Sequence, residues 1–335
     1  MLDNNINKII ADALTVDKNN LSNNIIPIIN QIKIAISNNK ETIIEANKID
    51  KSNNFGFTID FNIINNIFNN LEQETLYYGN VTLSQKDDKK QIIYGTQIMD
   101  YGNVIVINDG NTYVIIEMIL RNIMAGNTTI LSNDGYMYGT NQLLIQIVQS
   151  VLEQFNISKY LVQIYISENY DEVLSNYANI DLVICIGNHN LQRLILNKSK
   201  NKTIISGYEN FDLYIEDTKH IEFINKIIDT GLNIQLYINN NTKLDYPNSI
   251  IVDDIDEAIG QINYNGSKYA ASIFTNSNEN ASKFIKEVKS KIVTINTSPT
   301  IERIIDIKQR DLINEKTIIY PLNYKFGNNT ININI

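Results

Sequence analysis

The chain has 335 residues, with 28 Lys or Arg against 37 Asp or Glu and a formal net charge of −9. This acidity, without any Lys/Arg-rich stripe, argues against nucleic acid or an anionic membrane as the main partner, because both reward clustered positive charge. The single cysteine, Cys185, rules out an intramolecular disulfide and a cysteine-based metal cluster, and the two histidines rule out most His-dependent zinc sites. We therefore expect no metal site.

Hydropathy indicates a soluble protein. The first residues carry no basic segment followed by a long apolar run, and no stretch reaches the length needed to cross a bilayer. We expect a cytoplasmic location and no membrane partner. The heavy use of Asn, Ile and Tyr has two explanations that composition leaves open. One is the codon usage of an AT-rich genome, and the other is an Asn-rich assembly surface whose amides form ladders between stacked strands.

Residues 1–88 are expected to be helical. Isoleucines recur at helical spacing between residues 25 and 36, the stripe continues over residues 43–46, and Asn38 and Asn39 mark a break between the two. A further stripe covers residues 59–71. Such stripes form the core, so no chemistry is assigned to them.

Two segments outside the helical pattern predict β-structure. Residues 89–103 contain extended runs punctuated by Gly95 and Gly102. Residues 309–335 contain KTIIYPLNYKFGNNTININI, which reads as a hairpin with its alternation broken at Pro321 and a turn at residues 327–329.

Residues 104–216 predict a Rossmann-type parallel sheet. Short β-branched runs at residues 104–107, 128–131, 161–166 and 181–186 alternate with segments of helical periodicity. In such a sheet a ligand lies beyond the carboxyl ends of the strands. The residues that fall there are Asn108, Asp109, Gly110, Asn111, Ser132, Asn133, Asp134 and Gly187.

Residues 217–308 predict a second, smaller α/β domain. Strands are expected at residues 213–215, 235–238, 250–252, 271–274 and 292–295, with helices at residues 221–228 and 254–263. Asp256 and Glu257 suit the positive end of their helix, and Ser277 is expected to cap another. The fold class is therefore α/β with two domains.

Six segments carry a resemblance to a known family. They are AGNTTIL, DEVLSNYANIDLVICIGNHNL, SGYENFDLYIED, DDIDEAIGQINYNGSKYAASIFT, KEVKSKIVTINTS and PLNYKFGN. In this order they resemble glutamate-5-semialdehyde dehydrogenase, also called γ-glutamyl phosphate reductase, a branch of the aldehyde dehydrogenase superfamily. The likeness covers most of the chain and begins at ETIIEANKID, where the family has a comparable helix end. It implies an aldehyde dehydrogenase-like fold whose catalytic-type domain is truncated.

The resemblance also implies an oligomerisation arm. In the family, the segment that matches residues 89–103 leaves the cofactor domain, joins the C-terminal hairpin and returns. An exposed apolar ribbon of this kind needs a partner. We therefore expect a homo-oligomer or a filament formed through residues 89–103 and 309–335, since head-to-tail contacts that fail to close give a fibre.

The chemistry that the resemblance implies lacks its nucleophile. The family works by covalent catalysis, in which a cysteine thiolate attacks a carbonyl and a nicotinamide exchanges hydride with the intermediate. The position of the family cysteine falls on Thr230 or Gly231. Cys185 lies in the apolar run IDLVICIG, where we expect a core residue with a raised pKa. No catalytic residue is therefore assigned.

Other family positions differ as well. Where the family has Arg-Gly-Gly after the AGN strand, this chain has Ser132, Asn133 and Asp134, and the family's Pro-Arg-Gly-Gly becomes residues 185–188. Two cations that could meet a phosphate are lost, and Asp109 and Asp134 would repel one. The chain is also shorter than the family, mostly between residues 238 and 249.

Three functions stay open at this point. The sequence favours an inactive homologue, a pseudoenzyme, that serves as a self-assembling structural or binding subunit, with copies of itself or with an active paralogue. One alternative is a residual NADP-dependent reductase that converts glutamyl 5-phosphate to glutamate 5-semialdehyde in proline biosynthesis, using a hydroxyl such as Thr230. The other is a dinucleotide-binding sensor. Its candidate cofactor residues are Asn108, Asn111, Ser132, Gly187 and Asn188. No cofactor is expected unless the cleft is retained, in which case it is NADP.

Overall fold

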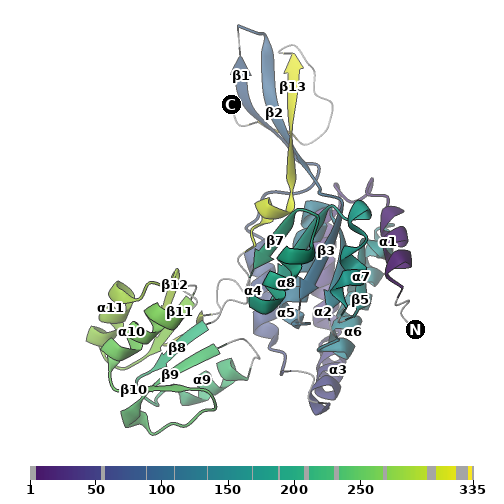
Figure 1. Ribbon diagram of the computed structural model, residues 1–335. Coiled ribbons are helices and arrows are strands. Elements are labelled where there is room, and N and C mark those ends of the chain that lie inside the picture. Colours follow the sequence, from purple (N-terminus) through teal and green to yellow (C-terminus); the bar gives the residue numbers. More distant parts are fainter. Residues whose placement is uncertain are drawn as a thin grey trace. The chain divides into compact units, whose positions relative to one another are not determined.

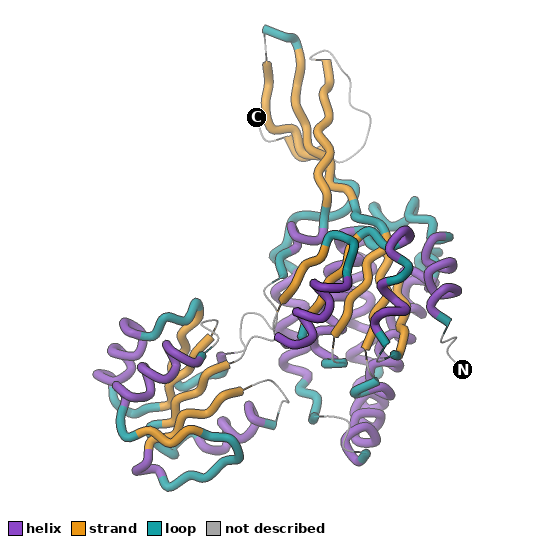
Figure 2. The backbone as a smooth tube through the Cα atoms, in the orientation of Figure 1, coloured by secondary structure: helices purple, strands orange, loops and turns teal. Residues whose placement is uncertain are grey.

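Three β-sheets organise the chain in the computed structural model, which describes residues 5–53, 57–87, 89–108, 110–133, 135–167, 169–187, 189–206, 211–229, 234–266, 270–299, 307–321 and 331–333. The chain divides into two units, whose elements are drawn in Figures 1 and 2. The first unit comprises Met1–Asp50, Leu71–Ser206 and Ile307–Ile335, and the second comprises Lys51–Asn70 and Gly207–Asp306.

The N-terminal helices follow the isoleucine stripes. They are α1 (Ile6–Leu14), α2 (Ile25–Asn38), α3 (Lys40–Ser52) and α4 (Phe61–Leu71). The expected break at Asn38 and Asn39 is confirmed, because α2 ends and α3 begins there. None of the helices in the described part of the chain is long and apolar enough to cross a membrane.

The expectation that helix continues to residue 88 is wrong at its end. Residues 81–87 form strand β1 (Val81–Asp87), which follows a turn at Gly79 with a φ of +84°. β1 pairs antiparallel with β2 (Ile92–Met99), and Leu83 is buried in the pair. Alternation at Val81 and Leu83 is the period of a strand, and pairing with β2 decides the structure over local preference.

The predicted Rossmann-type sheet of the first unit is confirmed. Its order is β5-β4-β3-β6-β7, and all its neighbouring strands are parallel. The strands are β3 (Asn103–Asn108), β4 (Thr128–Asn133), β5 (Val162–Ile166), β6 (Leu182–Ile186) and β7 (Thr203–Ser206). The strand order reverses between β3 and β6, so the carboxyl ends of these strands form the edge where such sheets bind ligands.

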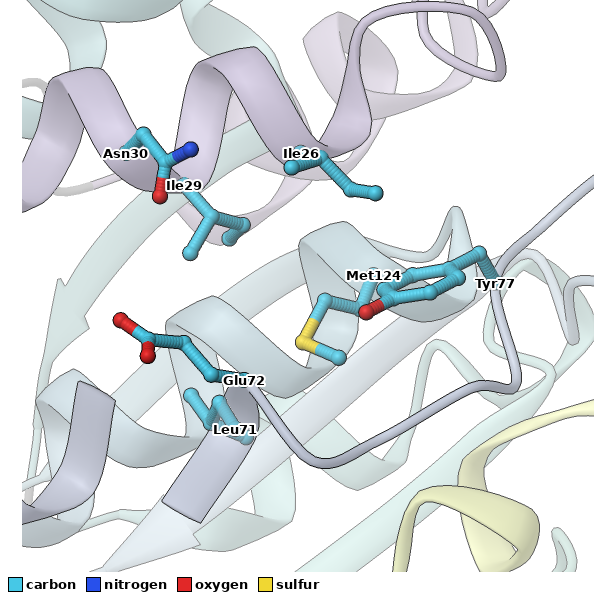
Figure 3. Close-up of a pocket in the computed structure, with 7 residues that line it drawn as sticks. All are labelled: Ile26, Ile29, Asn30, Leu71, Glu72, Tyr77 and Met124. Atoms are coloured by element: carbon cyan, nitrogen blue, oxygen red, sulfur yellow. The ribbon is translucent and has the colours of Figure 1, made fainter. Parts of the chain in front are cut away.

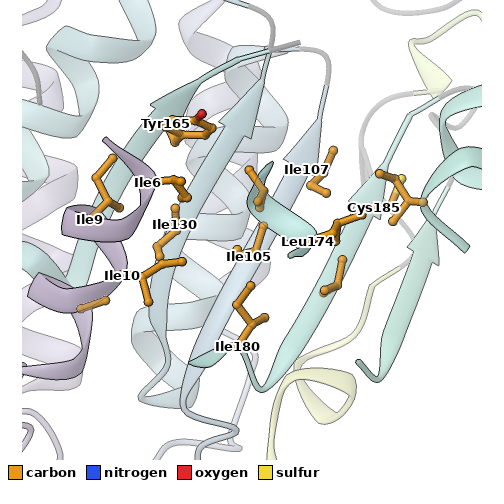
Figure 4. Packing of buried hydrophobic residues seen from close by; sticks show 14 residues of the cluster. Ile6, Ile9, Ile10, Ile105, Ile107, Ile130, Tyr165, Leu174, Ile180 and Cys185 are labelled. Carbon is orange, nitrogen blue, oxygen red and sulfur yellow. The ribbon is translucent and has the colours of Figure 1, made fainter. Parts of the chain in front are cut away.

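Helices cover both faces of this sheet. The face that carries Ile105 and Ile107 packs against α1, α7 (Tyr170–Leu174) and α8 (His189–Lys198), as Figure 4 shows. No residue of α5 (Thr112–Ala125) or α6 (Tyr138–Gln154) belongs to that cluster, although α5 packs on β4 and α6 on β5. These two helices therefore cover the opposite face. α5 is buried along its whole length, because α2, α6 and the C-terminal turn at Gln309–Leu312 pack around it.

The second unit is the predicted smaller α/β domain. Its parallel sheet has the order β10-β9-β8-β11-β12. The strands are β8 (Phe211–Ile215), β9 (Ile234–Asn239), β10 (Ile250–Val252), β11 (Ala270–Phe274) and β12 (Ile292–Ile295), and the helices are α9 (Ile221–Ile228), α10 (Ile255–Asn265) and α11 (Asn278–Glu287). Ser277 caps α11 by accepting from the backbone N of Asn280 at 3.2 Å, as expected.

The expected boundary at residue 216 is corrected by the sheet pairing. β8 lies before that residue, yet it pairs with β9 and β11 in the second sheet. The strand expected at residues 213–215 of the second domain is therefore found there as β8, and the second unit begins before this strand rather than after residue 216.

A four-stranded sheet with the order β13-β2-β1-β14 belongs to the first unit, and we call it the arm. β13 (Asn314–Pro321) pairs antiparallel with β2, so the expected pairing of residues 89–103 with the C-terminal segment is confirmed. The expected hairpin is wrong, because β14 (Ile331–Ile333) pairs parallel with β1 at the other edge. Each edge of the β1–β2 pair takes one strand, which covers its unpaired backbone groups. The predicted turn at residues 327–329 lies outside the described residues.

A single buried carboxamide ties the arm to the central sheet. The Oδ1 of Asn127 accepts from the backbone N of Tyr101 at 2.8 Å, and its Nδ2 donates to the carbonyl of Leu312 at 2.9 Å. Tyr101 follows β2 and Leu312 precedes β13. The chain is therefore bonded to Asn127 just after β2 and just before β13, two of the places where the arm joins the body.

Candidate functional site

Two neighbouring strands of the central sheet end in the same Asn-Asp-Gly sequence. Asn108 ends β3 and Asn133 ends β4, and the residues before them, Ile107 and Ser132, are direct partners. The Oδ1 of Asn108 accepts from the backbone N of Gly110 at 2.7 Å, and the Oδ1 of Asn133 accepts from Gly135 at 2.9 Å. Both carboxamides therefore close an Asx turn.

Both turns require glycine as their third residue. The φ values of Gly110 and Gly135 are +85° and +93°, in the left-handed region. A Cβ on Gly110 would lie 2.4 Å from the carbonyl oxygen of Tyr136. The first turn therefore packs directly on the backbone that follows the second.

Three polar atoms at these strand ends have no hydrogen-bond partner among the described residues. They are the Nδ2 of Asn108, the Oγ of Ser132 and the Nδ2 of Asn133. All three side chains are at most 1 % exposed. Since a buried donor without a partner costs free energy, the Nδ2 atoms of Asn108 and Asn133, which lie on the same face of neighbouring strands, are the donors best suited to receive acceptor oxygens, whereas Ser132 lies on the opposite face beside Ile107.

The predicted residue Asn111 caps α5. Its Oδ1 accepts from the backbone N of Tyr113 at 3.0 Å. Asn141, which sequence reasoning missed, supports the same turn, because its Nδ2 donates to the carbonyl of Gly110 at 2.7 Å. Its Oδ1 accepts from the hydroxyl of Thr112 at 2.7 Å. These contacts give Asn111 and Asn141 a conformational role.

Asp50 occupies the N-terminus of α6. Its carboxylate accepts from the backbone N of Gly139 at 3.1 Å and from the backbone N and hydroxyl of Thr140 at 2.8 and 2.6 Å. A carboxylate is stabilised there by the helix dipole. The N-terminus of a helix can bind a phosphate, but in this chain the carboxylate of Asp50 already occupies that position on α6. The motif ETIIEANKID contains this residue, but nothing local in it points to α6.

The remaining predicted cofactor residues are only partly described. Asn108 pairs with Ile186, so Gly187, the next residue after β6, lies beside the end of β3. The carbonyl of Gly187 accepts from the Nε2 of Gln192 at 2.8 Å. Asn188 lies outside the described residues, as do Asp109, Asp134, Thr230 and Gly231. The structure thus brings Asn108, Ser132 and Gly187 to one edge of the sheet.

Asn108, Ser132 and Asn133 at this edge are uncharged hydrogen-bond donors. Residues 122–158 and 160–192 contain no Lys or Arg, and Arg121 is buried in an ion pair. Carboxamides and a hydroxyl would suit ribose or carbonyl oxygens, whereas a pyrophosphate would meet no cation from these segments. In the described part of the chain, no group of three His, Cys, Asp or Glu side chains could hold a metal ion.

The expectation that Cys185 is a core residue is confirmed. It lies in β6, is 0 % exposed and belongs to the cluster that Figure 4 shows. Burial raises the pKa of its thiol to about 12. The thiol is therefore protonated at neutral pH, and it is not available as a nucleophile.

We expect Cys185 to resist Ellman's reagent at pH 8 in the folded protein and to react fully after unfolding in guanidinium chloride. Because its pKa in the folded protein lies above the reference value of 9.0, the folded thiol holds its proton while the unfolded thiol releases it. This residue therefore lowers stability as pH rises from about 9 towards 12. Fast labelling of the native protein would contradict the buried position.

Comparison with known proteins places these features in context. No protein-family model matches the chain. It is 23 % identical over 275 residues to the gamma-glutamyl phosphate reductase of Petrotoga mobilis, covering 66 % of both chains. It is 23 % identical over 264 residues to that of Dictyoglomus thermophilum, covering 62 % of this chain and 63 % of the relative. The matched region thus spans slightly less than two thirds of these relatives.

Solved structures show the same fold. The gamma-glutamyl phosphate reductase of Thermotoga maritima has a TM-score of 0.53 at 14 % identity, covering 96 % of this chain and 98 % of that one. An acetylating aldehyde dehydrogenase from Geobacillus thermoglucosidasius has a TM-score of 0.70 at 11 % identity, with coverage of 96 % and 97 %. The fold is therefore aldehyde dehydrogenase-like.

Proposed function

Because this chain is a distant relative of the gamma-glutamyl phosphate reductases with an aldehyde dehydrogenase-like fold, we propose that it is a catalytically inactive member that serves as a self-assembling structural or binding subunit. The main support for this proposal is that the chain's only thiol is buried and protonated. The resembled chemistry needs a cysteine thiolate, and the one cysteine is fully buried with a pKa of about 12.

The position of Cys185 in the sheet supports the same proposal. Cys185 pairs with Ile107 on one side and Ile205 on the other, so its backbone is fixed in the interior of the sheet. Exposing its sulfur would require the sheet to open. Thr230 and Gly231, which occupy the family position in the sequence, offer no thiol.

The surface of the arm supports self-assembly. The second half of β13, residues 318–321 (IIYP), is apolar, and all its side chains are exposed or half-buried, with Ile319 56 % exposed. Ile92 and Ile93 of β2 are only half-buried. An apolar ribbon of this kind is stabilised by a partner. A second copy of the chain or an active paralogue are the partners that we propose.

The catalytic half of the proposal is tested by an NADPH oxidation assay with glutamyl 5-phosphate, together with the reverse reaction with glutamate 5-semialdehyde and NADP. We expect no turnover above the rate without protein. A Cys185→Ala variant is the matched control and should behave as the parent. Turnover that survives Cys185→Ala and disappears in Thr230→Val would establish the residual reductase instead.

The assembly half is tested by light scattering on the purified chain over a range of concentrations. We expect an oligomer for the parent, and dissociation when Ile319→Lys places a charge on the arm. Ile34→Lys, at a residue of α2 that is 51 % exposed, is the control and should leave the mass unchanged. A chain that is monomeric at all concentrations would end the assembly proposal.

A dinucleotide sensor is the second candidate, and the buried donors at the ends of β3 and β4 favour it. The Nδ2 atoms of Asn108 and Asn133 are aligned on neighbouring strands without a partner among the described residues. Calorimetric titration with NADPH and NADP tests it. Saturable binding that Asn133→Ala abolishes would support the sensor, and absence of heat at millimolar nucleotide would exclude it.

A further inference from the structure

A pocket of about 370 Å³ lies in the first unit, near the C-terminal end of α5 and so at the opposite end of that helix from the Asn-Asp-Gly turns. Figure 3 shows the residues that line it, which are Ile26, Ile29, Asn30, Leu71, Glu72, Tyr77 and Met124. This volume falls in the range of small-molecule sites. None of the lining residues belongs to a strand of the arm.

The pocket has an apolar end and a polar end. Figure 3 shows Ile26, Met124 and the ring of Tyr77 together at one end, and Asn30 and Glu72 at the other. The Nζ of Lys33 lies 2.8 Å from the Oε1 of Glu72, so both signs of charge meet at the polar end. That ion pair is partly exposed, with 34 % and 57 % of the two side chains accessible. The polar end is therefore reachable from solvent.

The walls of the pocket are formed before any ligand arrives. Ile26, Ile29, Asn30 and Lys33 share one face of α2 at helical spacing. The hydroxyl of Tyr77 donates to the carbonyl of Glu74 at 2.6 Å, which holds the ring in place.

The segment after Tyr77 is fixed to α5 as well. The backbone N of Tyr78 donates to the carbonyl of Met124 at 2.9 Å. Gly126, with a φ of +77°, allows the close approach of the Tyr78 ring, because a Cβ there would lie 2.4 Å from it. A preformed pocket spares the ligand the free-energy cost of ordering it.

We propose that this pocket binds a free α-amino acid with an apolar side chain. The ammonium group would donate to Glu72 and to the carboxamide oxygen of Asn30. The carboxylate would accept from Lys33 and from the Nδ2 of Asn30, so each charged group of the zwitterion meets its complement. The side chain would pack at the apolar end.

Ligands with one charge fit the polar end less well. An amine without a carboxylate gains no contact with Lys33 and is repelled by it. A carboxylate without an amine faces Glu72 in the same way. The neutral Lys33–Glu72 pair therefore selects the zwitterion over either single ion.

The test uses the full chain labelled with ¹³C at its methionine methyl groups and titrated with leucine. We expect a saturable shift of the Met124 signal, assigned with a Met124→Leu variant, while the signals of Met99 and Met137 stay in place. Calorimetry then gives the affinity. Glu72→Gln should weaken binding about tenfold through loss of one charge-assisted contact.

Matched variants and ligands decide the outcome. Ile26→Glu places a charge at the apolar end and should weaken binding about tenfold, as expected for a lost apolar contact. Ile34→Glu changes an exposed isoleucine of the same helix outside the pocket lining and should leave binding unchanged. The proposal is overturned if 3-methylbutylamine or 4-methylpentanoate binds as tightly as leucine, if Ile34→Glu weakens binding equally, or if the Met124 signal does not move.

Discussion

Replacing Arg121 with methionine is expected to lower the free energy of unfolding of the first unit by about 3–5 kcal/mol. The side chain of Arg121 is 1 % exposed, and its Nε lies 2.9 Å from the Oε1 of Glu117 while Nη1 lies 3.1 Å from Glu74. Glu117 is 4 % exposed on the same helix. Removing the cation therefore leaves a carboxylate in the core without its charged partner. Urea unfolding followed by circular dichroism measures the loss.

Two further variants control this result. Arg193→Met removes an exposed arginine of α8 and should change stability by less than about 0.5 kcal/mol. The double variant Arg121→Met with Glu117→Leu should recover part of the loss, because an apolar pair of similar volume can replace a buried ion pair. If Arg121→Met alone cost less than 1 kcal/mol, the ion pair would not be buried as described.

Replacing Phe284 with alanine is expected to cost about 3–5 kcal/mol in the second unit. Phe284 is 0 % exposed and stacks on Tyr214 with a centroid distance of 6.4 Å. It lies in the cluster that joins α10 and α11 to the sheet. The substitution leaves a cavity in this cluster. The surrounding side chains cannot close it fully, because the helices and the sheet that carry them stay in place.

The location of this loss tests the division into two units. Hydrogen exchange measured by mass spectrometry should show faster exchange in β8 and β11 and no change in β3 and β4. Ile285→Ala, at the next residue of α11, where the side chain is 52 % exposed, is the control and should have little effect. Equal acceleration in both units would show that they unfold together.

The parallel sheets could be predicted from sequence because their signals are local. Runs such as VIVI between helical segments specify buried strands, and Asp254 and Ser277 mark the starts of α10 and α11 through their own side chains. The residues that determine each of these strands and helix starts lie within one strand or one helical turn of each other in the sequence.

The errors lie where distant pairing decides the structure. β1 is a strand because β2 is beside it, and β14 joins β1 although β13 is nearer to it in sequence. The second unit begins before the boundary expected at residue 216, because β8 pairs with β9 and β11. No local spacing carries this information.

The candidate site was predictable to the same extent. The polar residues after β3 and β4 follow from the topology, because a parallel sheet collects its strand ends at one edge. Asp50 could not be found in this way, since its partner Thr140 is 90 residues away. The duplicated Asn-Asp-Gly sequence was the available signal for a shared turn structure.

The attachment of the arm at Asn127 has a mechanical consequence for any assembly. Because one carboxamide holds the chain where it leaves β2 and where it enters β13, the arm cannot swing at these two connections without breaking hydrogen bonds to Asn127. These two bonds therefore restrict the angle between the arm and the central sheet. Copies joined through their arms would hold their central sheets in a defined mutual orientation, and the symmetry of the assembly would be set by the angle at this joint.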